Sequence, residues 1–485
     1  MDSASAMTHR PFQGHRYHFS GVGGSGMAPL AALSVALGAT VSGSDRNLDR
    51  GLTLHVFEDL RHAGVRLTPQ DGSAIDSSLT ALVHSSAVET TNAEFQRAVA
   101  LGVARVRRGT FLAGIAAERR TIAIAGTSGK SSVTAMIAHI LTSAGRDPSF
   151  LGGGAAARLD GAAPFGSLRV GRGEWFVVET DESDGSVAEF APAVAVVSNL
   201  SRDHKEVDET ARNFEAMLAK TRERIVVNAK DASLERVHLP AELPVLAVAA
   251  GDGETWMAPE LRAEAVHLYP DRVEFTVQDI VARVPFPGSL TVENAILALG
   301  AAVAAGVSLP EACRALATFA GVRRRLERIG AMHGVDVFDD FAHNPVKIGA
   351  ALEALRPSGA LWVYYQPHGY GPTRFFAAQL IETFRAGLKD RDRLVLAPIY
   401  DAGGTADRSI RSEDLARALR DAGVDAVVSP TRDEAARLLT ENAKSGDRIV
   451  VMGARDDTLP AFARTLYADL VAREDATPSP ERQPR

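Results

Sequence analysis

The sequence has few of the features that mark secreted or membrane proteins. It contains 485 residues but a single cysteine, Cys313, so no disulfide can form within the chain. The alanines and leucine around Cys313 favour a packing role in a helix core. No uninterrupted apolar run is long enough to span a bilayer, and the N-terminus lacks the apolar stretch of a signal peptide. We therefore expect a cytoplasmic protein with no membrane partner.

The chain also lacks an excess of positive charge. The chain carries 53 Lys and Arg against 60 Asp and Glu, a net charge of −7 at pH 7. This balance gives no general attraction to nucleic acid, so we expect no nucleic-acid partner. A hydrophobic content of 46% and a charged content of 23% are those of an ordinary globular protein. The length predicts about three domains.

Residues 121–133 run from an apolar strand through a glycine turn into a helix. The first N–H groups of such a helix can cradle a polyphosphate, Lys130 can reach the terminal phosphates, and the Ser131 hydroxyl can ligate Mg²⁺. The general motif has Gly at position 124, where this chain has Ile124. A strand, loop and helix without a ligand is the alternative. The expected ATP-binding residues here are Gly126, Thr127, Ser128, Gly129, Lys130, Ser131 and Ser132.

Two later strands end in polar residues. The run at 175–178 opens into Glu179-Thr-Asp-Glu-Ser-Asp184, and carboxylates beside a phosphate turn predict a Mg²⁺ site. A solvated acidic turn is the alternative. The strand at 194–198 ends in residues 199–204 on the same expected sheet edge, which brings His204 within reach of a metal or a phosphate.

A second glycine turn lies near the N-terminus. Strand 16–20 leads into Gly-Val-Gly-Gly-Ser-Gly, a helix follows over 27–37, and a second strand over 40–43 ends in Ser-Asp. In other proteins this layout binds a pyrophosphate and a ribose. A further strand, within residues 81–87, ends in two serines that are plausible contacts to the same ligand. A purely structural turn and an NAD-dependent oxidoreductase are the alternatives. The expected sugar-nucleotide contacts are Gly21, Gly23, Gly24, Ser25, Gly26, Met27, Ser44, Asp45, Ser85 and Ser86.

The last third of the chain alternates strands and helices after a basic cluster at 323–325. Strands are expected at 335–338, 361–365, 393–397, 426–429 and 448–452, and helices at 375–388, 412–422 and 434–443. This alternation predicts a second doubly wound parallel sheet.

In this order the segments resemble the Mur ligase family over nearly the whole chain. The resemblance rests on residues 21–27 with 44–45, then 125–131, 179–184, 199–204, 292–294, 321–327 and 340–345. It implies an α/β fold with a Rossmann-like UDP-sugar domain at 15–118, a central P-loop ATPase domain at 119–321, and a Rossmann-like C-terminal domain at 322–472. Residues 1–14 and 473–485 are expected to be disordered.

The resemblance also implies a reaction. ATP phosphorylates the carboxylate of UDP-N-acetylmuramate, and an amino acid, alanine in the most similar branch, attacks the acyl phosphate to form an amide. ADP and phosphate leave, and the enzyme is expected to be a monomer or weak homodimer. The family's catalytic positions match Lys130, Glu179, His204 and Arg325, with Ser131, Glu179 and His204 on Mg²⁺. Nucleotide contacts match Asn294, Arg325 and Asp340, and amino-acid contacts match His343, His368 and Arg374.

The chain departs from that branch in the C-terminal domain. Residues 366–374 read Gln-Pro-His-Gly-Tyr-Gly-Pro-Thr-Arg, so Gly369 and Pro372 stand where the branch carries two carboxylate-binding arginines. Arg374 is the expected substitute. Lys220 falls near a lysine that other branches carbamylate, although we favour a surface lysine. A ligase for another amino acid or a peptide, and a non-catalytic UDP-sugar-binding regulator, remain as alternatives.

Overall fold

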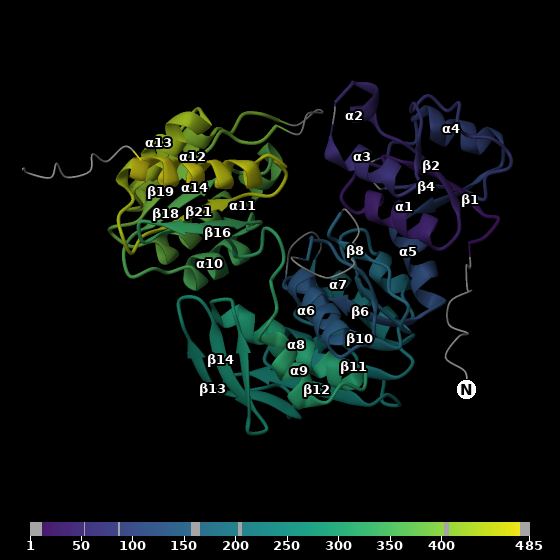
Figure 1. Cartoon of the computed structure of the whole chain (residues 1–485), viewed down its shortest axis with the longest axis horizontal. Helices are drawn as coiled ribbons and strands as arrows, with labels where there is room; N and C mark the ends of the chain where they lie inside the picture. Colours follow the sequence, from purple (N-terminus) through teal and green to yellow (C-terminus); the bar gives the residue numbers. More distant parts are fainter. Residues whose placement is uncertain are drawn as a thin grey trace, which may run out of the picture. The chain divides into compact units, whose positions relative to one another are not determined.

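The chain folds around three sheets. A computed structural model describes residues 12–52, 54–85, 88–156, 165–201, 206–401 and 407–475. The first compact unit, made of residues 1–267, 274–285 and 292–320, holds two sheets (Figure 1). The second unit, made of residues 268–273, 286–291 and 321–485, holds the third. The sheets confirm the predicted α/β class with three sheet cores, whereas the exact domain boundaries stay predictions.

The N-terminal sheet is parallel throughout, in the order β3-β2-β1-β4-β5. Because β1 lies between β2 and β4, the strand order reverses beside the first glycine turn, where α/β proteins bind ligands. The strands are β1 (Arg16–Ser20), β2 (Thr40–Ser44), β3 (Arg66–Leu67), β4 (Ala81–His84) and β5 (Ala104–Arg107). The helices are α1 (Met27–Ala36), α2 (Arg46–Asp49), α3 (His55–His62), α4 (Ala93–Ala100) and α5 (Arg108–Ala117).

The central sheet has ten strands in the order β15-β14-β13-β12-β11-β10-β6-β9-β7-β8. Strand β6 is parallel to both neighbours, so β6, β9 and β10 end at one edge. The strands are β6 (Arg120–Ala125), β7 (Ser149–Leu151), β8 (Leu168–Arg169), β9 (Trp175–Glu179), β10 (Val194–Val197), β11 (Arg224–Asn228), β12 (Val245–Ala250), β13 (Leu261–Leu268), β14 (Val273–Val277) and β15 (Ile280–Val284). The helices are α6 (Lys130–Ser143), α7 (Val207–Leu218), α8 (Ser289–Ala304) and α9 (Leu309–Leu316), with 3₁₀ turns η1 (Ser186–Glu189) and η2 (Ala232–Arg236).

The C-terminal sheet runs β16-β17-β21-β18-β19-β20, with β16 antiparallel and the other pairs parallel. The central strands β18 and β21 are mostly apolar because both faces of the sheet are covered: Val450 and Met452 of β21 join one core, Ile449 and Val451 the other. The strands are β16 (Glu327–Met332), β17 (Val335–Asp340), β18 (Leu361–Tyr365), β19 (Arg393–Leu396), β20 (Ala426–Val428) and β21 (Arg448–Met452). The helices are α10 (Pro345–Ala354), α11 (Tyr370–Gly387), α12 (Ser412–Asp421), α13 (Arg432–Asn442) and α14 (Leu459–Asp475).

One predicted helix was wrong at its start. Helix α11 begins at Tyr370, five residues before the predicted residue 375. Pro372 lies in its first turn, where a missing backbone N–H breaks no intrahelical hydrogen bond. Arg374 is therefore a helical residue and not part of the preceding loop.

The sequence predicted a packing role for the single cysteine and no membrane-spanning segment. Cys313 is buried, and this burial raises the pKa of its thiol to about 11. That environment supports the packing role. Among the helices in the described ranges, none combines the length and apolar character needed to cross a membrane.

Strand β17 ends in two buried carboxylates. Side chains alternate along a strand, so Asp339 and Asp340 point to opposite faces. Both side-chain oxygens of Asp339 are buried without a hydrogen-bond partner among the described residues, and the Arg324 Nε atom lies 3.4 Å from its Oδ2. Burial raises the pKa of Asp339 to about 6, against the lowering effect of the Arg324 charge.

The raised pKa predicts a pH-dependent effect of Asp339→Asn on stability. Since the folded pKa lies above the usual 3.8, the carboxyl's contribution is complete below that value and is lost as pH rises through about 6. When the pH is raised from 4.5 to 7.5, the unfolding free energy of the parent should fall by about 2 kcal/mol more than that of the variant. Urea unfolding measures this, with exposed Asp425→Asn as the control. A difference that does not change with pH would contradict the assignment.

Candidate active site

Two glycines shape the turn between β6 and α6. Gly126 has φ 140° and Gly129 has φ 82°, values that favour glycine. A Cβ atom would overlap Ser198 Oγ at the first position and Asn294 Oδ1 at the second. The structure thus places predicted residue Asn294 against the phosphate turn. The turn delivers the uncapped start of α6, whose first N–H groups have no partner inside the helix.

Asn199 fixes the shape of this turn. Its Oδ1 accepts hydrogen bonds from the Thr127 and Ser128 N–H groups at 3.0 and 2.8 Å. Its Nδ2 donates to the Ser128 carbonyl at 3.0 Å, which the Ser198 hydroxyl also reaches at 2.9 Å. The sequence placed residues 199–204 at this edge but gave Asn199 no role. Its position directly after the strand next to β6 was the available signal.

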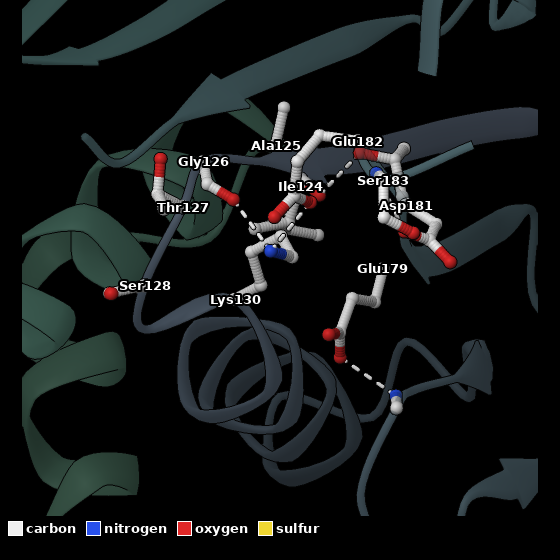
Figure 2. Close-up of polar contacts among 12 residues, drawn as sticks. Ile124, Ala125, Gly126, Thr127, Ser128, Lys130, Glu179, Asp181, Glu182 and Ser183 are labelled. Carbon is white, nitrogen blue, oxygen red and sulfur yellow. Dashed lines mark hydrogen bonds and ion pairs between the residues drawn. The ribbon is translucent and has the colours of Figure 1, made fainter. Parts of the chain in front are cut away.

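Lys130 is held between a carbonyl and a carboxylate. Figure 2 shows its Nζ donating to the Gly126 carbonyl at 2.6 Å and lying 2.8 Å from Glu182 Oε2. The two charged side chains are only 13% and 10% exposed, so each offsets the desolvation of the other. The contact fixes the ammonium group at the mouth of the turn, where a terminal phosphate of ATP would meet it.

Glu179 and Ser131 form an oxygen-rich pair at the start of α6. The Ser131 hydroxyl donates to Glu179 Oε1 at 3.2 Å, and Glu179 Oε2 accepts from the Gly153 N–H at 2.7 Å. A hydroxyl and a carboxylate are hard ligands that fit Mg²⁺. Within the described part of the chain, no three His, Cys, Asp or Glu side chains gather as a metal cage. The Mg²⁺ site stays a prediction, and predicted His204 lies outside the described residues.

Arg108, which the sequence analysis missed, connects this acidic segment to the N-terminal glycine turn. Its Nη2 lies 2.7 Å from Asp181 Oδ2 and 3.7 Å from Asp184 Oδ2. A Cβ atom at Gly26 would lie 3.2 Å from its Nη1. Burial raises the pKa of Asp181, but the Ser183 hydroxyl and the Arg108 charge outweigh it and leave the pKa below its usual range. No spacing rule links these distant residues, so the sequence gave no signal.

Asp45 braces the N-terminal glycine turn. Its Oδ2 accepts from the Gly23 N–H at 3.0 Å, and its Oδ1 accepts from Asn47 at 2.9 Å. A Cβ atom at Gly23 would lie 2.9 Å from both that Oδ2 and Phe57 Cε1, so only glycine fits without a shift. Both carboxylate oxygens therefore bind backbone N–H groups and support the turn. The sequence had predicted that Asp45 contacts the sugar nucleotide, which stays a prediction.

The other predicted sugar-nucleotide residues follow the same edge. The Ser44 hydroxyl lies at the end of β2, 3.5 Å from Gln70 Nε2. Ser85 follows β4 directly, and Ser86 lies outside the described residues. The remaining members lie between β1 and the start of α1: Gly21, Gly24, Ser25 and Met27. The structure thus brings the described members to the carboxyl ends of adjacent parallel strands.

In the second unit, Arg325 lies in a strained turn. Its neighbours Arg324 and Leu326 have φ of 59° and 46°, uncommon for residues with side chains. Buried Asp340 holds this turn by accepting the Leu326 N–H through Oδ2 and the Ala342 N–H through Oδ1, both at 2.7 Å. Burial raises the pKa of Asp340, although these N–H groups oppose the shift. The geometry supports a positioning function for Asp340.

Of the three residues predicted to contact the amino-acid substrate, two lie together and the third lies apart from them. The rings of His343 and His368 are 4.8 Å apart in an edge-to-face contact, and His343 Nδ1 lies 2.8 Å from the Phe341 carbonyl. Arg374 instead pairs with Asp407 at 3.0 Å and is half-exposed. Burial is the main cause that lowers the pKa of His343 to about 3.

Lys220 follows α7 on the surface. Its Nζ donates to the Ala188 carbonyl at 2.8 Å and the residue is exposed. This contact agrees with a surface lysine, and carbamylation remains a prediction without support here.

Comparison with known proteins assigns these sites to one family. Residues 16–120 match the Mur ligase family catalytic domain, residues 124–302 the Mur ligase middle domain, and residues 324–455 the Mur ligase glutamate ligase domain. A UDP-N-acetylmuramate–L-alanine ligase of Cyanothece sp. is 31% identical over 91% of this chain and 93% of its own. One from Burkholderia cenocepacia is 33% identical over 90% and 94%. The chain belongs to the Mur ligase family. As a member, it is an ATP-dependent ligase.

Solved structures of Mur ligases share the fold. A UDP-N-acetylmuramate–alanine ligase from Thermotoga maritima has a TM-score of 0.75 at 21% identity, covering 94% of this chain and 99% of its own. A murein peptide ligase from Psychrobacter arcticus has a TM-score of 0.64 at 24% identity, covering 96% and 100%. These matches agree with the α/β architecture described above.

Lys130→Ala should abolish most turnover. The substitution removes a cation placed to stabilise charge on the transferring phosphoryl group, so kcat should fall by at least about 100-fold. Because it also leaves the buried Glu182 carboxylate without its partner, turnover is compared at a temperature at which circular dichroism shows the variant to be folded. Phosphate release under saturating ATP measures this, with exposed Lys389→Ala as the control. Turnover within a few-fold of the parent would refute the role of Lys130.

His343 should stay neutral across the working pH range. With its pKa lowered to about 3 by burial, the imidazole should show no titration between pH 5 and 8. Histidine ring chemical shifts in NMR spectra measure this, and loss of the signal in His343→Gln assigns it. A midpoint near pH 6.5 would contradict the expectation.

Proposed function

We propose that this Mur ligase joins a small amino acid, with L-alanine the first candidate, to UDP-N-acetylmuramate. In this reaction ATP is converted to ADP and phosphate, and the product serves peptidoglycan synthesis. The observation that carries the proposal is the juxtaposition, within one unit, of the Lys130 turn and the glycine turn ending at Gly26. Arg108 contacts both neighbourhoods. The names of the relatives with full-length similarity support the same substrates.

The ATP site supports phosphoryl transfer to a carboxylate. A carboxylate is a poor electrophile, and phosphorylation converts one of its oxygens into a leaving group. The N–H groups at the start of α6 and the Lys130 ammonium would bind the phosphates and neutralise charge as it moves between oxygens. The Ser131 hydroxyl and Glu179 carboxylate would hold Mg²⁺, which would supply further charge neutralisation. Asn199 keeps the turn in shape for this task.

The N-terminal turn suits the diphosphate of the sugar nucleotide. Helix α1 has no side-chain cap at Gly26, but its Met27 and Ala28 N–H groups already donate to the Gly24 carbonyl and Pro29 has no N–H. The Ser25 and Gly26 N–H groups of the turn itself have no partner among the described residues, so these are the groups left for an anion. Arg108 would add a positive charge from the other side of that turn. Both Asp45 oxygens already accept backbone N–H groups, which weakens the alternative that this carboxylate binds the ribose of NAD. A hydride-transfer function also leaves the ATP site without a purpose.

A ligase for a different amino acid or a peptide is the second candidate. The specific observation that favours it is the sequence at Gly369 and Pro372, where the alanine-adding branch carries arginines. At neighbouring Gly371, a Cβ atom would meet nothing within 4 Å, so this segment has room for a larger substrate.

Phosphate release with ATP, UDP-N-acetylmuramate and a panel of amino acids and peptides tests the proposal. We expect product with L-alanine or another small amino acid, and none when the sugar nucleotide is omitted. Gly23→Val should weaken UDP-N-acetylmuramate binding at least about 10-fold with ATP binding spared, because its side chain would crowd Asp45 and Phe57. Gly114→Ala, at an exposed helix position where a Cβ atom would meet nothing within 4 Å, is the control. Product only with a peptide would support the second candidate, and tight NAD binding without sugar-nucleotide binding would overturn both.

A further inference from the structure

Arg455 is a cation without a partner at the carboxyl edge of the C-terminal sheet. Its side chain is exposed and makes no hydrogen bond or ion pair with any described residue. Strands β18 and β21 are parallel neighbours in which Tyr365 pairs with Met452. The segments that follow them therefore leave the sheet side by side. A Cβ atom at Gly369 would lie 3.5 Å from Arg455 Nη1.

The same place holds the start of a long helix. Gly369 is the N-cap residue of α11, which runs for 18 residues, and no side chain caps it. The N–H groups of Tyr370 and Gly371 belong to the first turn, where an α-helix has no internal acceptors. A Cβ atom at Gly371 would find open space. An uncapped helix start and an unpaired guanidinium thus face one another beside His368.

We propose that Arg455 and the start of α11 bind the α-carboxylate of the incoming amino acid. This inference rests on the proposed ligase function and names the residue that reads the second substrate. The guanidinium supplies charge and two parallel donors, which match the two oxygens of a carboxylate. The helix start adds N–H donors and the positive end of its dipole. Arg374 is unsuited because Asp407 already pairs with it.

The absence of a paired acid at Arg455 matters for this assignment. Lys130 and Arg108 each lie within 2.8 Å of a carboxylate oxygen, which a substrate anion would have to displace or share. Arg455 has no such competitor among the described residues. An incoming carboxylate therefore gains the full charge of the guanidinium, and the Gly369 backbone lets the two approach because no side chain stands between them.

Arg455→Ala tests the assignment by steady-state kinetics on the full-length enzyme. We expect the KM for the amino acid to rise about 10- to 100-fold while the KM for ATP and the melting temperature change little. The parent should prefer L-alanine, or the amino acid that the panel identifies, over the corresponding amide. The variant should lose most of that preference, because the amide lacks the charge that Arg455 reads. Arg455→Lys should recover part of it, and exposed Arg417→Ala should behave as the parent.

The outcomes separate this inference from the proposed function. An Arg455→Ala variant that keeps the parent's preference for carboxylate over amide overturns the inference and leaves the ligase function intact. A rise in the KM for ATP alone assigns the cation to phosphate and also overturns it. If the parent forms no product with any amine, the proposed function fails. Calorimetric titration with L-alanine then decides the inference: weaker binding by Arg455→Ala supports it, whereas equal binding or none to the parent overturns it.

Discussion

The placement of glycine turns at the carboxyl ends of parallel strands is the constraint on which the rest of this structure depends. A strand that ends at the start of a helix directs unpaired N–H groups toward one edge of the sheet, and such groups stabilise negative charge. The chain builds this junction at β1–α1, β6–α6 and β18–α11. Glycine immediately precedes each helix, at Gly26, Gly129 and Gly369, and none of the three has a side-chain cap. The starts of α6 and α11 are therefore candidate anion sites, whereas at α1 the Met27 and Ala28 N–H groups donate to the Gly24 carbonyl and only the turn's own N–H groups remain.

The cations at these edges differ in how they are held. Lys130 and Arg108 are anchored by Glu182 and Asp181, so their positions are fixed before a ligand binds. Such pairing lowers the cost of partial burial but reduces the charge that an anion would feel. Arg455 is exposed, and no described acidic residue pairs with it. The difference suits the proposed chemistry: phosphoryl transfer requires fixed geometry, whereas recognition of a small substrate requires an accessible charge.

The sequence was sufficient for features set by local spacing. Both glycine turns, the strands that precede them and the alternation of the C-terminal sheet were predicted because apolar runs and glycines determine them within a few residues. The start of α11 was wrong because Pro372 resembles a helix breaker unless its place in the first turn is known. Asn199, Arg108 and Arg455 could not be assigned roles. Each acts on a segment far away in sequence, and only the packed sheet brings the two together.

The same reasoning explains how a site can change residues without changing its chemistry. A carboxylate at the edge of the C-terminal sheet needs a positive charge near the start of α11, but the sheet does not specify which strand supplies it. Strands β18 and β21 end in register, so a residue a few positions beyond either strand can reach the same point. Gly369 at one strand end leaves room for Arg455 from the other. Comparing residues 366–374 with the family motif shows only that arginines are replaced at Gly369 and Pro372. The proposed compensating charge, Arg455, lies more than eighty residues further along the chain.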